Sequence, residues 1–285
     1  MKFEWDHSKP LEYVKCGLCG ADDTRLVTTE DSFKIVECKR CGLIYLNPRP
    51  KEKDLSEFYD DFFSTDEESV SQWSRLMGRV YEDTKRNIER KYSSGKLLDM
   101  GCGLGLFLKL WNPQKWELFG MDISKKAVEY AQSKGLNVRE GSLEKTDFSD
   151  NYFDVITMFY VLEHLPNPLK VLEEVRRILK KDGLLVVRVP QSISAERFLK
   201  FFGVRRNLFH PPMHLYDFST EILREFSLKA GFKKIKTVIG RPTSPERRIE
   251  RFWTNYFNLW AQGIYFLTAR KVLVPGVSKT TYAKI

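Results

Sequence analysis

The stretch "LLDMGCGLG" at residues 97–105 ends an apolar run with an aspartate and then places three glycines at alternate positions. A short apolar run followed by glycines indicates a buried strand that turns sharply. Glycines in such a turn let the backbone approach a ligand closely. We therefore expect a strand over 96–100, a ligand-binding turn at 101–105 and a helix over 104–111.

The rest of the chain alternates between strand and helix patterns. Strands are predicted at 116–122, 136–141, 152–160, 184–190, 233–239 and 263–272, and helices at 70–92, 124–135, 168–183 and 219–232. Such alternation gives a mostly parallel sheet covered by helices on both faces. The predicted fold class is α/β with a doubly wound sheet, a small N-terminal module and a C-terminal helical cap.

The glycine turn departs from two phosphate-binding sequences. The fingerprint G-x-G-x-x-G needs a third glycine where this chain has Leu106, and the Gly-Lys-Ser/Thr of a P-loop is absent. Asp122 closes the second strand, 23 residues after Asp99, and can accept hydrogen bonds from a ribose. Because ligands of open sheets lie beyond the carboxyl ends of the strands, we expect Asp122 and the turn at one site.

Four of the five cysteines form two C-x-x-C-G units, "CGLCG" and "CKRCG", with 18 residues between them. Two thiolates three positions apart can bind one tetrahedral ion, and the following glycine lets each turn close tightly. Disulfides are the alternative, but they do not suit the cytoplasmic compartment that we expect. The pattern predicts a structural zinc site at Cys16, Cys19, Cys38 and Cys41.

Five further motifs carry a family resemblance over about residues 95–240. They are "LLDMGCGLG", "FGMDIS", "FDVITMFYVLEHLPNP", "LKKDGLLVVRVP" and "LKAGF". In this order and spacing the chain resembles class I S-adenosylmethionine-dependent methyltransferases, which implies a Rossmann-like fold. The cysteine module followed by "GLIYLNPRP" also resembles bacterial methyltransferases encoded among polysaccharide and natural-product genes, some of which act on sugars.

The resemblance implies a site for S-adenosylmethionine. Its residues would be Asp99, Gly101, Cys102, Gly103, Gly105, Asp122, Ile123, Ser142, Leu143, Phe159 and Tyr160. Asp99 and the glycine turn would face the methionine end of the cofactor, and Asp122 would hold the ribose hydroxyls. The residues that follow Asp122 and the third strand would contact the adenine, and the pair that ends the fourth strand would lie below the sulfonium. We interpret Cys102 as a small residue under the cofactor, with a nucleophile as the alternative.

Methyl transfer often needs a base, and histidine is the common base near neutral pH. Of the four histidines, His164, His210 and His214 follow predicted strand ends. We expect His214 to be the base, with His210 and Tyr216 positioning the substrate. His164 is a second catalytic candidate, or it orients a loop, and the adjacent Glu163 would tune or orient. A metal site at His210 and His214 is disfavoured by the two prolines between them.

The excess of basic over acidic side chains lies in the last third of the chain. The formal net charge is +9, and residues 192–285 alone hold 17 basic against 6 acidic side chains. A field of one sign attracts phosphates, nucleic acid or an acidic membrane surface, although it can also be only a solubilising face. No apolar run is long enough to span a membrane, and the start "MKFEWDHSKP" lacks the apolar region of a signal peptide. We expect a cytoplasmic protein, with peripheral contact at the inner membrane face as a further expectation.

The segment "SPERRIERFWTNYFNLWAQG" at 244–263 predicts a helix with an aromatic stripe and arginines at its start. Such a helix caps its own domain, covers an anionic or lipid-linked acceptor, lies in a membrane interface, or stacks on bases. The expected organisation is a zinc ribbon at 1–50, a helical linker or lid at 51–94, the cofactor-binding domain at 95–240, and the cap helix with a final strand at 241–285.

The function that these features predict is methyl transfer from S-adenosylmethionine to a small or lipid-linked anionic acceptor, such as a nucleotide-sugar or glycan precursor. One alternative is an RNA methyltransferase, which the zinc module and the basic third suggest. The sequence "MFYVLEHLP" after the fourth strand lacks the Asn/Asp-Pro-Pro-aromatic segment of many base methylases. The other alternative is a non-catalytic cofactor-binding module that docks onto a protein partner.

Overall fold

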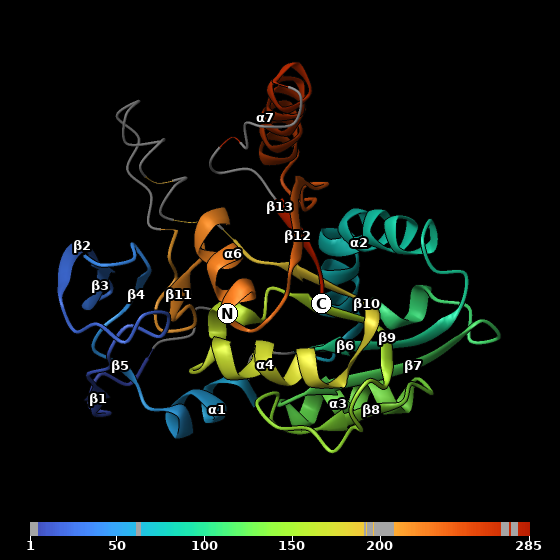
Figure 1. Cartoon of the computed structure of the whole chain (residues 1–285), viewed down its shortest axis with the longest axis horizontal. Helices are drawn as coiled ribbons and strands as arrows, with labels where there is room; N and C mark the ends of the chain where they lie inside the picture. Colours follow the sequence, from blue (N-terminus) through green and yellow to red (C-terminus); the bar gives the residue numbers. More distant parts are fainter. Residues whose placement is uncertain are drawn as a thin grey trace.

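The computed structural model of the chain describes residues 5–60, 64–190 and 208–268, the C-terminal residues 279–285, and the single residues Ser192, Glu196 and Val274. Within these residues a seven-stranded sheet forms the centre, in the order β12-β13-β10-β9-β6-β7-β8 (Figure 1). Its strands are β6 (Gly95–Met100), β7 (Trp116–Asp122), β8 (Val138–Glu140), β9 (Phe153–Phe159), β10 (Leu179–Arg188), β12 (Lys234–Ile239) and β13 (Lys279–Lys284). The α/β fold with a mostly parallel sheet is confirmed.

The strands β8, β7, β6, β9 and β10 pair in parallel, and β13 pairs antiparallel with both β10 and β12. The central strands are apolar along almost their whole length and are buried on both faces, as parallel sheets require. The carboxyl ends of the parallel strands therefore meet at one edge of the sheet.

Helices cover both faces of the sheet. Helices α4 (Pro168–Ile178) and α6 (Thr220–Lys229) pack against one face, and α2 (Glu67–Glu89) and α3 (Lys125–Ser133) against the other. Three of them begin at a side-chain cap, because Asp66, Ser124 and Ser219 each accept a hydrogen bond from the backbone N–H three residues later. These caps explain why the sequence pattern located the helix starts closely.

The N-terminal module contains a second sheet, in which β11 (Tyr216–Asp217) joins β4 (Ile44–Leu46), β3 (Phe33–Cys38) and β2 (Thr24–Glu30). The short strands β1 (Leu11–Glu12) and β5 (Arg49–Pro50) pair beside it, and α1 (Glu52–Asp60) follows. Strand β11 comes from far along the chain, and the Leu46 N–H donates to the Leu215 carbonyl at 2.9 Å. The four-cysteine module therefore shares a sheet with the segment that carries His214.

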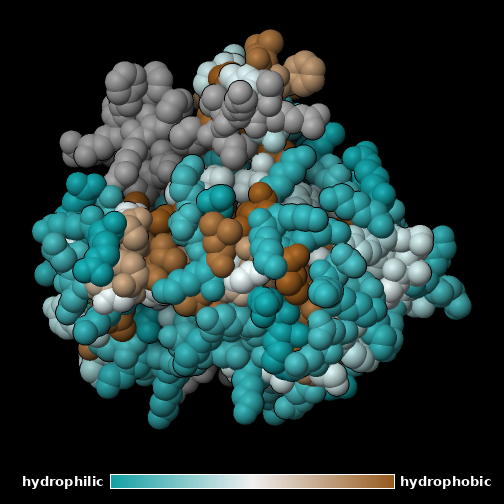
Figure 2. Space-filling model, viewed as in Figure 1, coloured by the Kyte–Doolittle hydropathy of each residue, from teal (hydrophilic) through white to brown (hydrophobic). Residues whose placement is uncertain are grey.

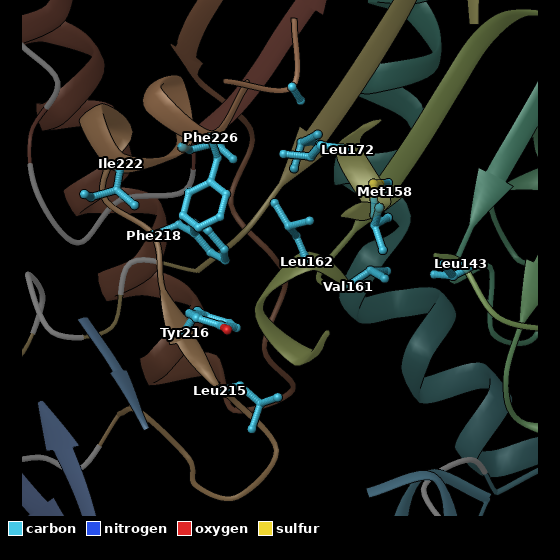
Figure 3. Close-up of a cluster of buried hydrophobic side chains, with 14 of the residues drawn as sticks. Leu143, Met158, Val161, Leu162, Leu172, Leu215, Tyr216, Phe218, Ile222 and Phe226 are labelled. Carbon is cyan, nitrogen blue, oxygen red and sulfur yellow. The ribbon is translucent and has the colours of Figure 1, made fainter. Parts of the chain in front are cut away.

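Figure 3 shows how this segment is fixed to the main domain. Leu162 lies in the short 3₁₀ turn η2 (Leu162–His164), with Phe218 and Phe226 on one side of it and Leu172 of α4 on the other. All four side chains are buried. The packing joins η2, α4 and α6 into one apolar core next to this edge of the sheet.

Three predictions of secondary structure are corrected, and one strand was missed. Instead of a helix over 104–111 there is only the 3₁₀ turn η1 (Leu108–Leu110), because Gly103 and Gly105 adopt positive φ angles of 48° and 70° that a helix excludes. The helix predicted to Gly183 ends at Ile178, where β10 begins. The strand predicted at 263–272 is wrong over 263–267, because α7 (Arg248–Leu267) runs to Leu267, and 269–272 lie outside the described residues. The strand β13, rich in buried threonines, was not predicted.

Candidate active site

A cavity of about 770 Å³ opens at the carboxyl ends of β6, β7 and β9. At one end its wall is the turn of residues 101–104 with Asp122, which we call the glycine-turn end. At the other end the wall includes Tyr59, Glu163, His164, Met213 and His214, which we call the histidine end. The cavity thus joins the predicted cofactor residues to two of the predicted catalytic residues.

The glycine-turn end is fixed by backbone geometry and by one carboxylate. Gly101 has a φ of 73°, and a Cβ there would lie 2.3 Å from a methyl carbon of Val161, so only glycine fits. The Asp122 carboxylate accepts from the Gly103 N–H at 2.7 Å and from the Ser124 N–H at 2.9 Å. Burial raises the pKa of Asp122, while these two donors lower it. The carboxylate is therefore held at the mouth of the turn.

Nine of the eleven predicted cofactor residues line the cavity: Gly101, Cys102, Gly103, Asp122, Ile123, Ser142, Leu143, Phe159 and Tyr160. The other two, Asp99 and Gly105, do not. Asp99 lies beneath the turn, where it accepts from the Thr157 hydroxyl at 2.6 Å, and burial raises its pKa to about 7. A Cβ on Gly105 would lie 2.4 Å from Leu136. Both residues support the turn from behind.

Cys102 is buried in the turn. Burial, with the Asp99 and Asp122 carboxyls nearby, raises the pKa of its thiol well above the ordinary value. A thiol that stays protonated is a poor nucleophile. This environment agrees with the interpretation of Cys102 as a small residue under the cofactor.

At the histidine end, one backbone carbonyl organises two side chains. The His164 Nδ1 lies 2.8 Å from the Met213 carbonyl oxygen, and the Tyr59 hydroxyl donates to the same oxygen at 2.9 Å. Because a carbonyl only accepts, the Nδ1 of His164 carries the proton in this contact. Burial lowers the pKa of His164 to about 4. The ring is therefore neutral at neutral pH.

His214 faces His164, with ring centroids 4.9 Å apart. Its pKa falls well below the ordinary value, mainly through burial and then through the nearby His164 and His210 rings. Two neutral imidazoles therefore line the same wall. A neutral imidazole has one nitrogen lone pair that can accept a proton or a hydrogen bond.

Glu163 stands out at this end of the cavity, and the sequence indicated only an orienting role for it. It is fully buried, and neither carboxyl oxygen has a hydrogen-bond partner among the described residues. Burial raises the pKa of Glu163 to about 8, with Asp217 contributing, so the group is protonated at neutral pH. Ligand atoms of Glu163, His164 and His214 lie within 4.8 Å of one another, and this donor set could hold a metal ion.

His210 and Tyr216 do not line the cavity, which corrects the prediction that they position the substrate directly. The His210 N–H donates to the Glu30 carboxylate at 2.9 Å, and its ring lies 5.8 Å from that of His214. The buried Tyr216 hydroxyl donates to the Pro166 carbonyl at 3.0 Å and accepts from Arg49 at 3.1 Å. Both residues connect the wall that carries His214 to the N-terminal sheet.

Helices α1 and α2 supply an apolar wall that the sequence did not assign to the site. Leu55, Tyr59, Trp73, Leu76, Met77 and Tyr81 line the cavity. None of the described residues that line it is lysine or arginine, whereas five are acidic: Glu52, Asp122, Glu140, Glu144 and Glu163. The basic excess of the chain therefore lies outside this cavity, and an anionic group of an acceptor finds no cationic partner among the described lining residues.

The four cysteines of the N-terminal module gather at one point. The Sγ atoms of Cys16 and Cys41 are 3.4 Å apart, those of Cys19 and Cys38 are 3.6 Å apart, and all four lie within 4.8 Å of one another. A tetrahedral zinc with bonds of about 2.3 Å separates its sulfurs by about 3.8 Å, so this donor set suits zinc. The two knuckles also match, since the Gly20 and Gly42 N–H groups donate to the Cys16 and Cys38 carbonyls.

Comparisons with known proteins agree with this geometry. Residues 98–187 match the family described as Methyltransferase domain. The chain is 30% identical over 179 residues to the uncharacterized protein MJ0638 of Methanocaldococcus jannaschii, covering 59% of this chain and 74% of that protein. It is 28% identical over 176 residues to the ubiquinone biosynthesis O-methyltransferase of Glaesserella parasuis, covering 56% and 73%.

Solved structures show the same fold. An S-adenosylmethionine-dependent methyltransferase of Thermotoga maritima aligns with a TM-score of 0.52 at 19% identity, covering 81% of this chain and 99% of that one. Phosphoethanolamine N-methyltransferase 2 of Haemonchus contortus, in complex with S-adenosylmethionine, aligns with a TM-score of 0.55 at 15% identity, covering 85% and 62%. The fold, the glycine turn with its strand-end aspartate, and the sequence matches lead to one conclusion: this chain belongs to the class I S-adenosylmethionine-dependent methyltransferases.

Proposed function

We propose that the chain methylates a sugar hydroxyl of a lipid-linked, anionic glycan precursor, with the sugar inside the cavity and the anionic carrier outside it. This proposal rests on the chemical character of the cavity wall at the histidine end, opposite the glycine turn. It holds two neutral imidazoles and a protonated carboxyl, but no lysine or arginine among its described residues. Such a wall suits an uncharged polyol better than a phosphate.

S-adenosylmethionine, when bound, would supply a methyl group open to in-line attack at its carbon, with the sulfonium sulfur as the leaving group. Asp122 would hold the ribose hydroxyls, while Phe159 and Tyr160 lie on the cavity side of β9, where they exclude water. Alignment of the acceptor oxygen with the methyl group is expected to supply most of the acceleration. The chain's own contribution is therefore chiefly orientation.

His214 would take the proton of the acceptor hydroxyl at a ring nitrogen. Its depressed pKa makes it a weak base but keeps the nitrogen unprotonated. A weak base suffices here, because a hydroxyl oxygen that is gaining a methyl group becomes strongly acidic as the new bond forms. Glu163 and His164 would hydrogen-bond to neighbouring hydroxyls and orient the sugar.

The test begins with calorimetric titration of the protein with S-adenosylhomocysteine and, for comparison, with NAD. We expect micromolar binding of the first and none of the second. Transfer of a labelled methyl group is then measured to lipid-linked glycans, free nucleotide sugars and RNA. Labelling of the lipid-linked glycans supports the proposal, while labelling of RNA alone, or of nucleotide sugars alone, contradicts it.

We also propose that Cys16, Cys19, Cys38 and Cys41 bind one structural zinc ion. The ion would fix the sheet that holds β11, and through it the loop of His210 and His214. Removing zinc with a chelator is expected to lower the melting temperature and turnover while sparing affinity for S-adenosylhomocysteine. A protein that contains no zinc and melts unchanged in the chelator would disprove this assignment.

A further inference from the structure

Helix α7 exposes more apolar surface than any other described part of the chain. Nine of the thirteen exposed large apolar side chains among the described residues lie on it: Ile249, Phe252, Trp253, Tyr256, Phe257, Leu259, Trp260, Phe266 and Leu267. Leu259 is 71% exposed and Leu267 is 84% exposed. Within α7 only Asn258 and Ala261 are buried. An exposed apolar patch of this size marks an interaction surface.

Figure 1 shows α7 projecting from the body beside β12 and β13, and Figure 2 shows apolar side chains at its place in the same view. In the sequence, α7 lies between β12 and β13, which pair with each other in the main sheet. Its described contacts with the body include the buried Asn258, whose side-chain amide donates to the Gly240 carbonyl at 3.1 Å, and Asn255, whose side-chain oxygen accepts from Arg79 of α2 at 3.4 Å. The nine exposed apolar side chains of α7 are therefore available to a partner.

The composition of α7 favours a lipid interface as that partner. Residues 252–267 carry no charged side chain, and they include two tryptophans and two tyrosines. Tryptophan and tyrosine prefer the boundary between lipid headgroups and acyl chains. No helix among the described residues is long and apolar enough to cross a membrane, so α7 would lie along the interface.

Charge adds a preference for anionic lipid. Arg247 and Arg248 lie exposed at the start of α7, and Arg251 follows one turn later. Glu250 lies 3.7 Å from Arg247, and Glu246 contacts Arg75 of α2 at 3.0 Å, so the local acids neutralise only part of this charge. The excess of 17 basic over 6 acidic side chains in residues 192–285 has the same sign. Each basic group near an anionic surface strengthens binding.

The attachment of α7 lies next to the cavity. Thr243, five residues before the helix, lines the cavity, and the Ser244 N–H donates to the carbonyl of Leu76 at 2.9 Å. Leu76 belongs to the apolar wall from α2. A surface that binds the beginning of α7 is therefore close to the cavity wall.

We propose that α7 binds in the interface of an anionic lipid membrane and brings the cavity to a lipid-linked acceptor. The second half of this statement rests on the proposed function, whereas lipid binding does not. The binding partner that we propose for α7 is a lipid surface that contains anionic headgroups.

The test is co-flotation of the full-length protein with vesicles of phosphatidylcholine, with and without one third phosphatidylglycerol, at low and high salt. We expect binding that needs the anionic lipid and weakens with salt, together with a blue shift of tryptophan fluorescence. The double variant Trp253→Ser/Trp260→Ser should bind at least tenfold more weakly, and Arg247→Glu/Arg248→Glu should lose the dependence on anionic lipid. The control is Leu26→Ser, which removes an apolar side chain more exposed (61%) than Trp253 (50%) or Trp260 (46%) from the N-terminal sheet and should bind as the wild type does.

Affinity for S-adenosylhomocysteine, measured on every variant, shows that the cofactor site stays folded. Methyl transfer to a short-chain, water-dispersed acceptor separates the two proposals, because it should survive the α7 substitutions if only lipid docking is lost. Failure of the wild-type protein to bind anionic vesicles would overturn the proposal. So would vesicle binding that the tryptophan substitutions leave unchanged, or a dimer in solution that the same substitutions dissociate.

Discussion

The two ends of the cavity are built in different ways. The glycine-turn end is assembled from residues close in sequence, as in the bond from the Gly103 N–H to Asp122, 19 positions apart. At the histidine end, Tyr59 contacts His164 across 105 positions and the Met213 carbonyl across 154. A short local motif thus forms the glycine-turn end, while the histidine end depends on distant segments packed together.

The largest effect is expected from breaking the glycine-turn end. Asp122→Ala should weaken S-adenosylhomocysteine binding about a thousandfold, because it removes the ribose acceptor and releases the Gly103 and Ser124 N–H groups. Calorimetric titration measures the loss, and circular dichroism checks the fold. The control is Glu117→Gln, on the same strand but pointing to solvent and paired with Lys96. Binding retained by Asp122→Ala would remove the ribose assignment.

The next largest effect is expected at the histidine end, and it should change turnover without changing cofactor affinity. His214→Ala should lower kcat about a hundredfold, within the range of a lost general base, and leave affinity for S-adenosylhomocysteine within a few-fold. Steady-state kinetics and titration on one preparation give both values. Unchanged turnover would dismiss His214 as the base, and equal losses in turnover and cofactor affinity would indicate a structural role instead.

How far each end could be predicted from the sequence follows from the same contrast. The turn, Asp122 and the strand ends were located correctly because positive-φ glycines and strand-end acids are local signals. The contributions of Tyr59 and Met213 to the site were missed, because no local sequence pattern indicates a contact between residues more than a hundred positions apart. Tyr216 was placed in contact with substrate because a two-residue strand such as β11, paired with β4, has no readable sequence period.

Two other differences have physical causes of the same kind. The segment after Ile178 continued the apolar helical period in the sequence, but the structure extends it as β10, where Lys180 binds Asp154 of β9 at 2.8 Å. In 263–267 an apolar run resembled a strand, although α7 continues through it. The protonated Glu163, whose carboxyl oxygens have no hydrogen-bond partner among the described residues, could not be predicted, because η2 is packed against β11, which lies about fifty positions away in the sequence.

A smaller effect is expected in the pH dependence of stability. The pKa of His164 is about 4 in the folded protein against an ordinary 6.5, so its stabilising contribution is complete above pH 6.5 and is lost as pH falls toward 4. His164→Asn keeps a donor for the Met213 carbonyl but does not titrate. Near pH 5 the wild type should therefore have lost about 2 kcal/mol of unfolding free energy that this variant does not lose.

Urea unfolding at a series of pH values measures this difference. The control is His7→Asn, which makes the same substitution at an exposed histidine of the N-terminal segment. Superimposable acid limbs for wild type and His164→Asn would mean that His164 is not held neutral by burial. Glu163 acts in the opposite direction, since its raised pKa of about 8 makes its contribution fall as pH rises from about 4.5 to 8.

The smallest effect is expected from a substitution that tests whether the N-terminal sheet supports the histidine end but not the glycine-turn end. Glu30, at the end of β2, accepts from the backbone N–H groups of His210 and Phe209, at 2.9 and 3.4 Å. Among the described residues, neither of these hydrogen bonds reaches the glycine turn. Glu30→Ala should therefore lower kcat about tenfold by releasing the loop that carries His214, while cofactor affinity stays unchanged.

Glu30→Gln keeps an acceptor oxygen and should recover much of the lost turnover, which a purely destabilising substitution at this position would not explain. Glu37→Gln, on the adjacent strand β3 and paired with Arg25, is the matched control. If Glu30→Ala weakened cofactor binding as much as turnover, the two ends would be coupled through the main sheet. If it changed neither, His214 would be held by the core around Leu162 and Phe218, and the cysteine module would not be needed to support the histidine end.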